Sequence, residues 1–148
     1  MMVSMKKIQE TLMTSIFNVF EKMFFVFLEP LDEDIQYDMV TSIKFTGVMK
    51  GEIKAYLSRG IVDIMAQNML SMEPSEITDQ TIEDCAKESI NMIAGSFLNK
   101  LEPSQVFDLS IPDFEKKTGQ FVKDSKATLS LSFDSDEQYM GVTLNLEA

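Results

Sequence analysis

The sequence predicts an α+β fold, a layered domain with a largely antiparallel sheet covered by long helices. Apolar residues recur at steps of three and four in two long segments, whereas they alternate in paired short segments elsewhere. The resulting order is a helix, a hairpin, two helices and three strands, which differs from the strict β-α-β alternation of a doubly wound sheet. We therefore expect one domain over residues 1–148, built in two or three layers.

The first helix and the first hairpin follow directly from these periods. An apolar stripe at helical spacing predicts a helix from about Met5 to Leu28, which Pro30 ends because the residue before a proline leaves the helical region. Alternating apolar residues in 40–45 and 53–57, with glycines between them, predict a β-hairpin.

Two helices are expected next. Ser58 is a residue of the type that caps helices, and the short apolar stripe after it continues until Pro74 closes the segment. Acids and hydroxyls in 75–79 favour the start of a long helix, which runs to about Leu101 before Pro103.

The last third of the chain is expected to contain three strands. A strand is predicted near 105–110, followed by a polar loop over 112–119. Alternating Thr, Leu, Ser, Phe and Val residues then predict a second hairpin from 127–133 and 139–146, with the polar turn at 134–137.

Composition excludes several classes of function. The formal charge of −11 disfavours binding to nucleic acid or to anionic membranes. The absence of histidine removes histidine-based nucleophile pairs and imidazole metal sites. Cys85 is the only cysteine and is expected to be a buried structural thiol. Neither a signal peptide nor a transmembrane helix is predicted, so we expect a cytoplasmic protein.

The second long helix carries the strongest candidate site. Asp84, Glu88, Asn91 and Gly95 are spaced by four, three and four residues, so they share the face opposite the apolar stripe. One interpretation is a solvated acidic face in which Gly95 accommodates a neighbouring strand. The other is a binding or catalytic face, where a glycine that costs about 1 kcal/mol relative to alanine allows a close approach.

The pattern of Asp84, Glu88 and Asn91 resembles the active-site motif of the CheC/CheX chemotaxis phosphatases. That motif is Asp or Ser, three residues, Glu, two residues, Asn, and then a proline about twenty residues later. Pro112 follows Asn91 after twenty intervening residues, close to the interval of the family. The order of elements from about residue 6 to 146 is also similar to that of the family.

This resemblance implies a hydrolase that removes the aspartyl phosphate from a CheY-like response-regulator receiver domain. It implies that Asn91 positions the attacking water and that Glu88 pairs with the receiver's active-site lysine. Asp84, Gly95 and Pro112 would have supporting or docking roles. No cofactor or metal is expected on this chain, because the Mg²⁺ belongs to the phosphorylated receiver.

CheC-like members carry a second copy of the site on their first helix, but here Ser15 occupies the position of the glutamate. A single site makes the chain more similar to CheX, whose members are implied to form homodimers through their sheets. Two alternatives remain open from the sequence: a non-catalytic adaptor that binds a receiver, and a dimerisation domain whose acidic helix is merely solvated.

Overall fold

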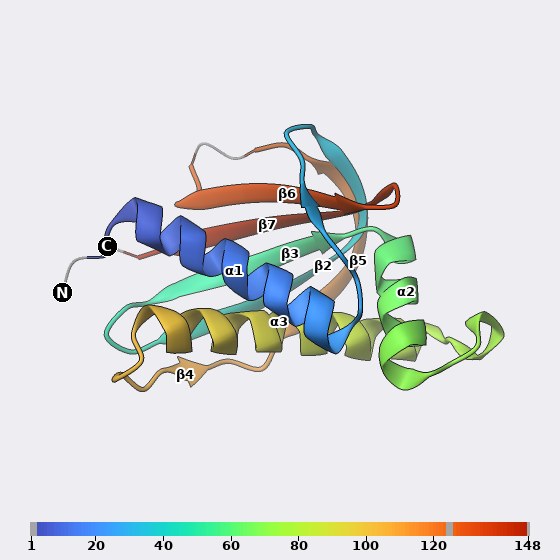
Figure 1. The fold of residues 1–148 in the computed structure, drawn as a ribbon, viewed down its shortest axis with the longest axis horizontal. Helices are drawn as coiled ribbons and strands as arrows, with labels where there is room; N and C mark the ends of the chain where they lie inside the picture. Colours follow the sequence, from blue (N-terminus) through green and yellow to red (C-terminus); the bar gives the residue numbers. More distant parts are fainter. Residues whose placement is uncertain (1–2, 124–125, 148) are drawn as a thin grey trace.

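The computed structural model describes residues 3–123 and 126–147 and confirms the α+β class. Figure 1 shows α1 and α3 lying across one face of a sheet, while α2 stands at one end of it. The elements in chain order are α1 (Met5–Met23), β1 (Glu29–Pro30), β2 (Ile35–Thr46), β3 (Gly51–Leu57), α2 (Arg59–Leu70), the short 3₁₀ helix η1 (Pro74–Glu76), α3 (Asp79–Leu101), β4 (Asp108–Leu109), β5 (Asp113–Phe121), β6 (Leu129–Ser135) and β7 (Gln138–Leu146).

The sheet is antiparallel at every described pairing, in the order β1-β6-β7-β3-β2, with β4 and β5 both paired to the far side of β2. The main core lies between this sheet and the two long helices, because each contributes an apolar face. Its largest fully buried side chains are aromatic, namely Phe20, Phe24, Phe45, Phe97 and Phe133.

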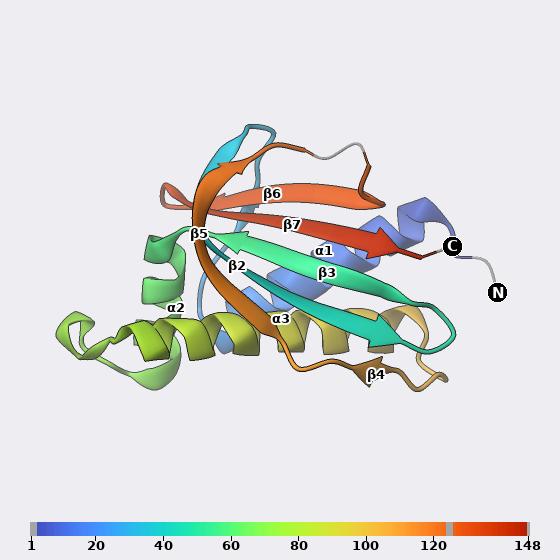
Figure 2. The same cartoon turned by 180° about the vertical axis from the view of Figure 1, so that it is seen from behind.

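The reverse face of the sheet carries a smaller apolar cluster. Figure 2 shows β5 bending across this face, and its register against β2 shifts between Tyr37 and Met39. Tyr56 lies between Tyr37 and Phe121, with ring centroids 5.1 and 5.0 Å apart. Gly141 lies beneath Phe121, where a β-carbon would come within 2.6 Å of the ring. The bent strand can therefore pack here only against a glycine.

The first helix ends at Met23, so the prediction that it continues to Leu28 is wrong. Phe25 adopts a left-handed conformation with φ of 55°, and the N–H of Val26 donates to the carbonyl of Phe20 at 2.9 Å. Side chains 24–28 then alternate between buried and exposed, so this apolar run does not form one face of a helix. A run that is entirely apolar hides this alternation from sequence reasoning.

The second helix is confirmed, but Ser58 does not cap it as predicted. Its hydroxyl donates to Gln138 Oε1 at 3.1 Å and accepts from the N–H of Tyr139 at 3.0 Å, which ties the helix start to β7. The Asp38 carboxylate, from β2, accepts the N–H of Arg59 at 2.7 Å instead. A carboxylate from outside the helix thus satisfies one of the unpaired donors at its N-terminus.

The long helix α3 confirms its predicted span. Thr78 accepts a hydrogen bond from the N–H of Thr81 at 3.1 Å, which caps the first turn. The preceding helix ends at Leu70, with Ser71 in the left-handed region, and Pro74 begins η1 rather than ending the helix itself.

The C-terminal third differs from the prediction in two places. The loop expected over 112–119 is wrong, because most of this segment forms β5 and pairs with β2. The strand expected at 105–110 is reduced to β4. The hairpin of β6 and β7 is confirmed, and it turns at Asp136 and Glu137, both with positive φ as a tight two-residue hairpin turn requires.

Candidate functional site

The site helix α3 presents three of the predicted residues to solvent. Asp84, Glu88 and Asn91 are all exposed, while the neighbouring Cys85 and Ser89 on the opposite stripe are buried. Because residues three and four apart lie on one helical face, the three polar side chains form a single line. The buried stripe against the sheet fixes the rotation of the helix, and so determines which face looks outward.

The fold brings Pro112 to this face, although it is distant in the sequence. The segment between β4 and β5 runs along the edge of β2 beside α3, and an open hollow of about 470 Å³ lies between them. The hollow contains four predicted residues and three that the sequence did not single out. Its lining is Asp84, Lys87, Glu88, Asn91, Ser110, Ile111 and Pro112.

Glu88 and Asn91 are available for an external partner. Neither side chain makes a hydrogen bond or an ion pair to any residue in the described part of the chain. Asp84 differs, because its Oδ1 accepts a hydrogen bond from Gln80 Nε2 at 2.8 Å. The carboxylate of Asp84 is thus already engaged within the helix, one turn before Glu88.

Lys87 adds a positive charge that sequence reasoning missed. Its ammonium group donates to Glu83 Oε2 at 2.7 Å, and both side chains are about one third exposed. This hydrogen bond raises the pKa of Lys87, and the charges of Glu83, Asp84 and Asp113 add to the effect. The sequence did not single out Lys87, because adjacent positions on a helix point in different directions and Lys87 is therefore not expected to share the face of Glu88.

Gly95 lies one turn beyond Asn91 and does not line the hollow. Apart from the backbone of its own helix, a β-carbon built at this glycine meets no described atom within 4 Å. The interpretation that Gly95 accommodates a neighbouring strand is therefore wrong. The helix surface here is open to an approach from outside.

Cys85 is a buried thiol, as predicted, and not a candidate nucleophile. Burial raises the pKa of Cys85 to about 12, and the negative charge of Glu88 adds to this. At neutral pH the thiolate is therefore almost absent, and the thiolate is the reactive form of a cysteine.

The first helix offers no second copy of the site. Ser15, at the position where a glutamate would be required, is fully buried, and its hydroxyl oxygen has no hydrogen-bond partner within the described residues. A residue that faces the core in this way cannot contact a docked domain.

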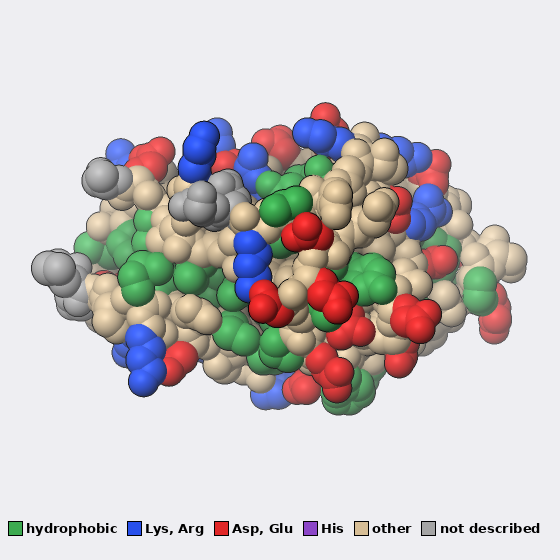
Figure 3. All heavy atoms as spheres, turned by 90° about the horizontal axis from the view of Figure 1, so that it is seen from above, with side chains coloured by type: hydrophobic (Ala, Val, Ile, Leu, Met, Phe, Trp, Pro, Cys, Tyr) green, Lys and Arg blue, Asp and Glu red, His purple; other side chains and the backbone are tan. Residues whose placement is uncertain are grey.

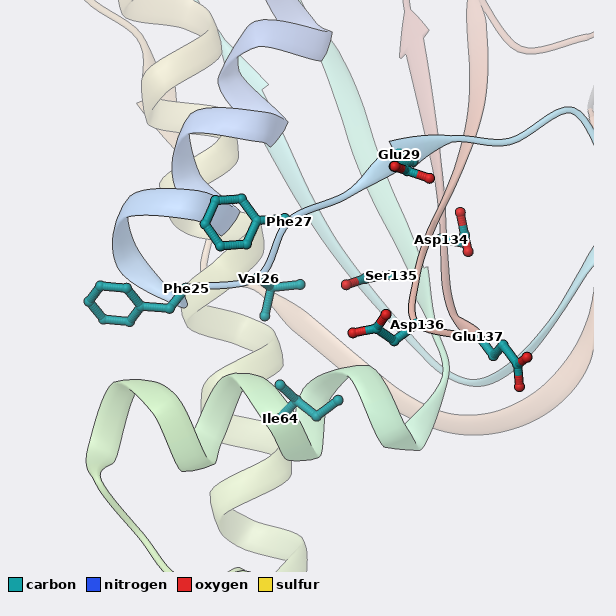
Figure 4. Close-up of a pocket in the computed structure, with 9 residues that line it drawn as sticks. All are labelled: Phe25, Val26, Phe27, Glu29, Ile64, Asp134, Ser135, Asp136 and Glu137. Carbon is teal, nitrogen blue, oxygen red and sulfur yellow. The ribbon is translucent and has the colours of Figure 1, made fainter.

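A second hollow lies elsewhere on the surface, away from α3. Figure 3 shows acidic side chains gathering beside hydrophobic ones on the face seen from above. A hollow of about 440 Å³ between the segment after α1, α2 and the β6–β7 turn has Phe27 and Ile64 on one side and the carboxylates of Asp134, Asp136 and Glu137 on the other (Figure 4). It shares no residue with the α3 site, and its carboxylates would repel a phosphoryl group.

The described residues offer neither a metal cluster nor a membrane-spanning helix. No group of three or more Cys, Asp or Glu residues there is arranged to hold a metal ion. None of the described helices has the length and apolar character needed to cross a bilayer.

A family model matches more than half of the chain. The family model described as chemotaxis phosphatase CheX matches residues 39–135, which run from within β2 to the end of β6. No curated protein sequence matches the chain.

Several solved structures share the fold. A chemotaxis protein CheX from Vibrio vulnificus is 20% identical, with 99% of this chain and 100% of that chain covered, and a TM-score of 0.81. A CheX from Desulfovibrio desulfuricans is 20% identical, with 95% and 99% covered and a TM-score of 0.75. CheX of Borrelia burgdorferi, solved as a complex with CheY, BeF₃ and Mg²⁺, is 18% identical, with 95% and 97% covered and a TM-score of 0.70.

Proposed function

The chain belongs to the chemotaxis phosphatase CheX family, and on this premise we propose that it hydrolyses the aspartyl phosphate of a CheY-like receiver domain. One observation carries the proposal: Glu88 and Asn91 share an exposed face of a firmly packed helix and have no partner within the described chain. The relative from Borrelia burgdorferi, which was solved in complex with CheY, supports a receiver domain as the partner.

Asn91 is proposed to position the attacking water. A side-chain amide offers one acceptor and two donors, so it can hold a water in one orientation without accepting a proton. The receiver already holds Mg²⁺ and a lysine that neutralise the phosphoryl charge, so hydrolysis lacks mainly this positioned water. The water oxygen bonds to phosphorus while the bond from phosphorus to the aspartyl oxygen breaks. The products are inorganic phosphate, which takes the proton, and a free aspartate.

Glu88 is proposed to act as a clamp rather than a base. It lies three residues from Asn91 on the same face, so its carboxylate can pair with the receiver's lysine while the amide reaches the phosphoryl group. Because no described residue neutralises Glu88, its full charge is available to a partner. Docking and water placement then depend on one rigid element.

The other residues of the site are assigned supporting roles. Asp84 is oriented by Gln80 and extends the negative face of the helix toward its N-terminus. Pro112 forms the opposite wall of the hollow, and Gly95 leaves the helix surface clear beyond Asn91. Mg²⁺ is expected on the receiver and not on this chain.

The test is the decay of a phosphorylated CheY-like receiver from the same organism in excess Mg²⁺. Asn91→Ala should reduce the accelerated decay about 100-fold, the loss expected for one transition-state hydrogen-bond donor, with little loss of binding. Glu88→Ala should weaken both turnover and binding. Asn99→Ala, an exposed asparagine on the same helix, is the matched control and should behave as the wild type.

Two results would count against the mechanism. Unchanged decay with Asn91→Ala would remove the water-positioning role. A wild-type protein that binds the phosphorylated receiver without accelerating its decay would make the protein an adaptor instead of a phosphatase.

A further inference from the structure

Ile111 is an apolar side chain presented at the edge of the candidate site. It is 86% exposed and lines the same hollow as Glu88 and Asn91. An isolated exposed apolar residue is common in proteins and needs no explanation by itself. The position of Ile111 beside an otherwise polar site, and the way its backbone is held, set it apart.

Hydrogen bonds to β2 fix the backbone on both sides of Ile111. On one side, the N–H of Ser110 donates to the carbonyl of Lys44 at 2.9 Å, and the Ser110 hydroxyl accepts the N–H of Lys44 at 2.9 Å. On the other side, the buried Thr41 hydroxyl donates to the carbonyl of Asp113 at 2.8 Å.

Between the last paired residue of β4 and the first of β5, the chain is one residue longer than the part of β2 that it faces. Leu109 pairs with Phe45 and Asp113 pairs with Ser42, so three residues oppose two residues of β2. An extra residue of this kind turns a side chain out of the sheet. Pro112 adds a further restriction, because it limits its own φ and keeps the preceding Ile111 extended. The backbone of Ile111 therefore has little conformational freedom to lose when a partner binds.

We propose that Ile111 is an apolar docking contact that holds the receiver domain against the α3 site. The contact rests on the proposed function, since the receiver is the partner that would cover the hollow. Continuity carries the assignment: a receiver surface that fills the hollow to reach Glu88 and Asn91 also contacts Ile111, which lines the same hollow. The charged groups orient the receiver, and the isoleucine supplies apolar burial beside them.

The experiment separates binding from turnover. Ile111→Ser should raise the Kd for the beryllofluoride-activated, Mg²⁺-bound receiver about tenfold, which corresponds to about 1.4 kcal/mol, and should raise KM in parallel. The kcat should stay within about twofold of wild type, because Ile111 does not contact the reacting atoms. Ile111→Val should recover most of the affinity.

Val106→Ser is the matched control, because Val106 is also 86% exposed and β-branched but does not line the hollow. It should leave Kd and KM unchanged. Equal losses in Val106→Ser and Ile111→Ser would overturn the proposal, as would a fall in kcat at constant Kd. A change of Ile111→Ser from dimer to monomer in light scattering would also overturn it, since the isoleucine would then be covered by a second copy of the chain.

Failure of this contact and failure of the proposed function give different results. If the wild type binds the receiver without accelerating its decay, the phosphatase proposal fails, and the Kd of Ile111→Ser still decides the docking contact. If Ile111→Ser binds as tightly as the wild type while Asn91→Ala loses turnover, the docking contact fails and the phosphatase remains.

Discussion

Gly95 is the position at which stability and function should respond in opposite directions. It lies within α3 with no positive φ, and a β-carbon there meets no described atom outside the backbone of its own helix. Gly95→Ala should therefore increase the free energy of unfolding by about 1 kcal/mol, as measured by urea denaturation. If the glycine leaves room for the receiver, the same variant should bind the receiver more weakly. A stabilised variant with unchanged affinity would remove Gly95 from the docking surface.

Cys85 should make the protein less stable in alkaline solution. Its pKa in the folded state is raised to about 12 from a usual value of 9.0, so above pH 9 the unfolded chain loses a proton that the folded chain keeps. Stability is then fully present below pH 9 and falls as the pH rises toward 12. Between pH 8 and pH 10 the free energy of unfolding should fall by about 1.4 kcal/mol because of this thiol.

The comparison that isolates this effect uses Cys85→Ala, which removes the titrating group. Urea denaturation of both proteins at pH 8 and pH 10 gives the two differences in the free energy of unfolding. The loss in the wild type should exceed the loss in Cys85→Ala by about 1.4 kcal/mol. Equal losses in the two proteins would mean that the thiol is not shielded from solvent in the folded state.

Among the elements, α2 depends on a carboxylate from another strand. Asp38 on β2 accepts the N–H of Arg59 at 2.7 Å, in the place of a local cap. Asp38→Ala should lower the free energy of unfolding by about 1 kcal/mol, the usual cost of losing a helix cap. Asp34→Ala, an exposed aspartate with no described partner, should change it by less than about 0.5 kcal/mol. Equal effects of the two substitutions would indicate a general charge effect rather than a cap.

The elements also show which parts of the fold can be predicted from sequence. The span of α3 and its exposed line of Asp84, Glu88 and Asn91 were predictable, because a helix period and its caps are local properties. The strand β5 was not, since both of its faces are largely exposed and its charged residues show no alternation. Its identity as a strand comes from pairing with β2, which is distant in sequence.

The site was predictable to a similar extent. Glu88 and Asn91 were found from spacing within one helix and from the family resemblance, and Pro112 only from that resemblance. Lys87, Ser110 and Ile111 were missed. Their places in the hollow depend on the register of the β4–β5 segment against β2, which no local pattern records.

For the whole molecule, the open edge of the sheet bears on assembly. β5 is nine residues long and pairs with β2 on one side, and no described strand pairs with its other side. Such an edge can pair with another chain unless charges discourage it. Exposed Glu115 and Lys117 lie on β5, so any pairing must satisfy their charges, whereas the ammonium group of Lys116 already pairs with Asp79 at 2.9 Å. Pairing of two identical edges would give a closed, twofold assembly and would remove the open edge.

We therefore predict a homodimer joined through the sheets, as the family resemblance implies. Light scattering at micromolar concentration should give a mass about twice the 16.8 kDa of the chain. A dimer would present two copies of the α3 site, and each copy would act separately because all the described lining of its hollow comes from one chain. A mass of one chain would mean that the charges on β5 are sufficient to keep its edge unpaired, and that each chain meets its receiver alone.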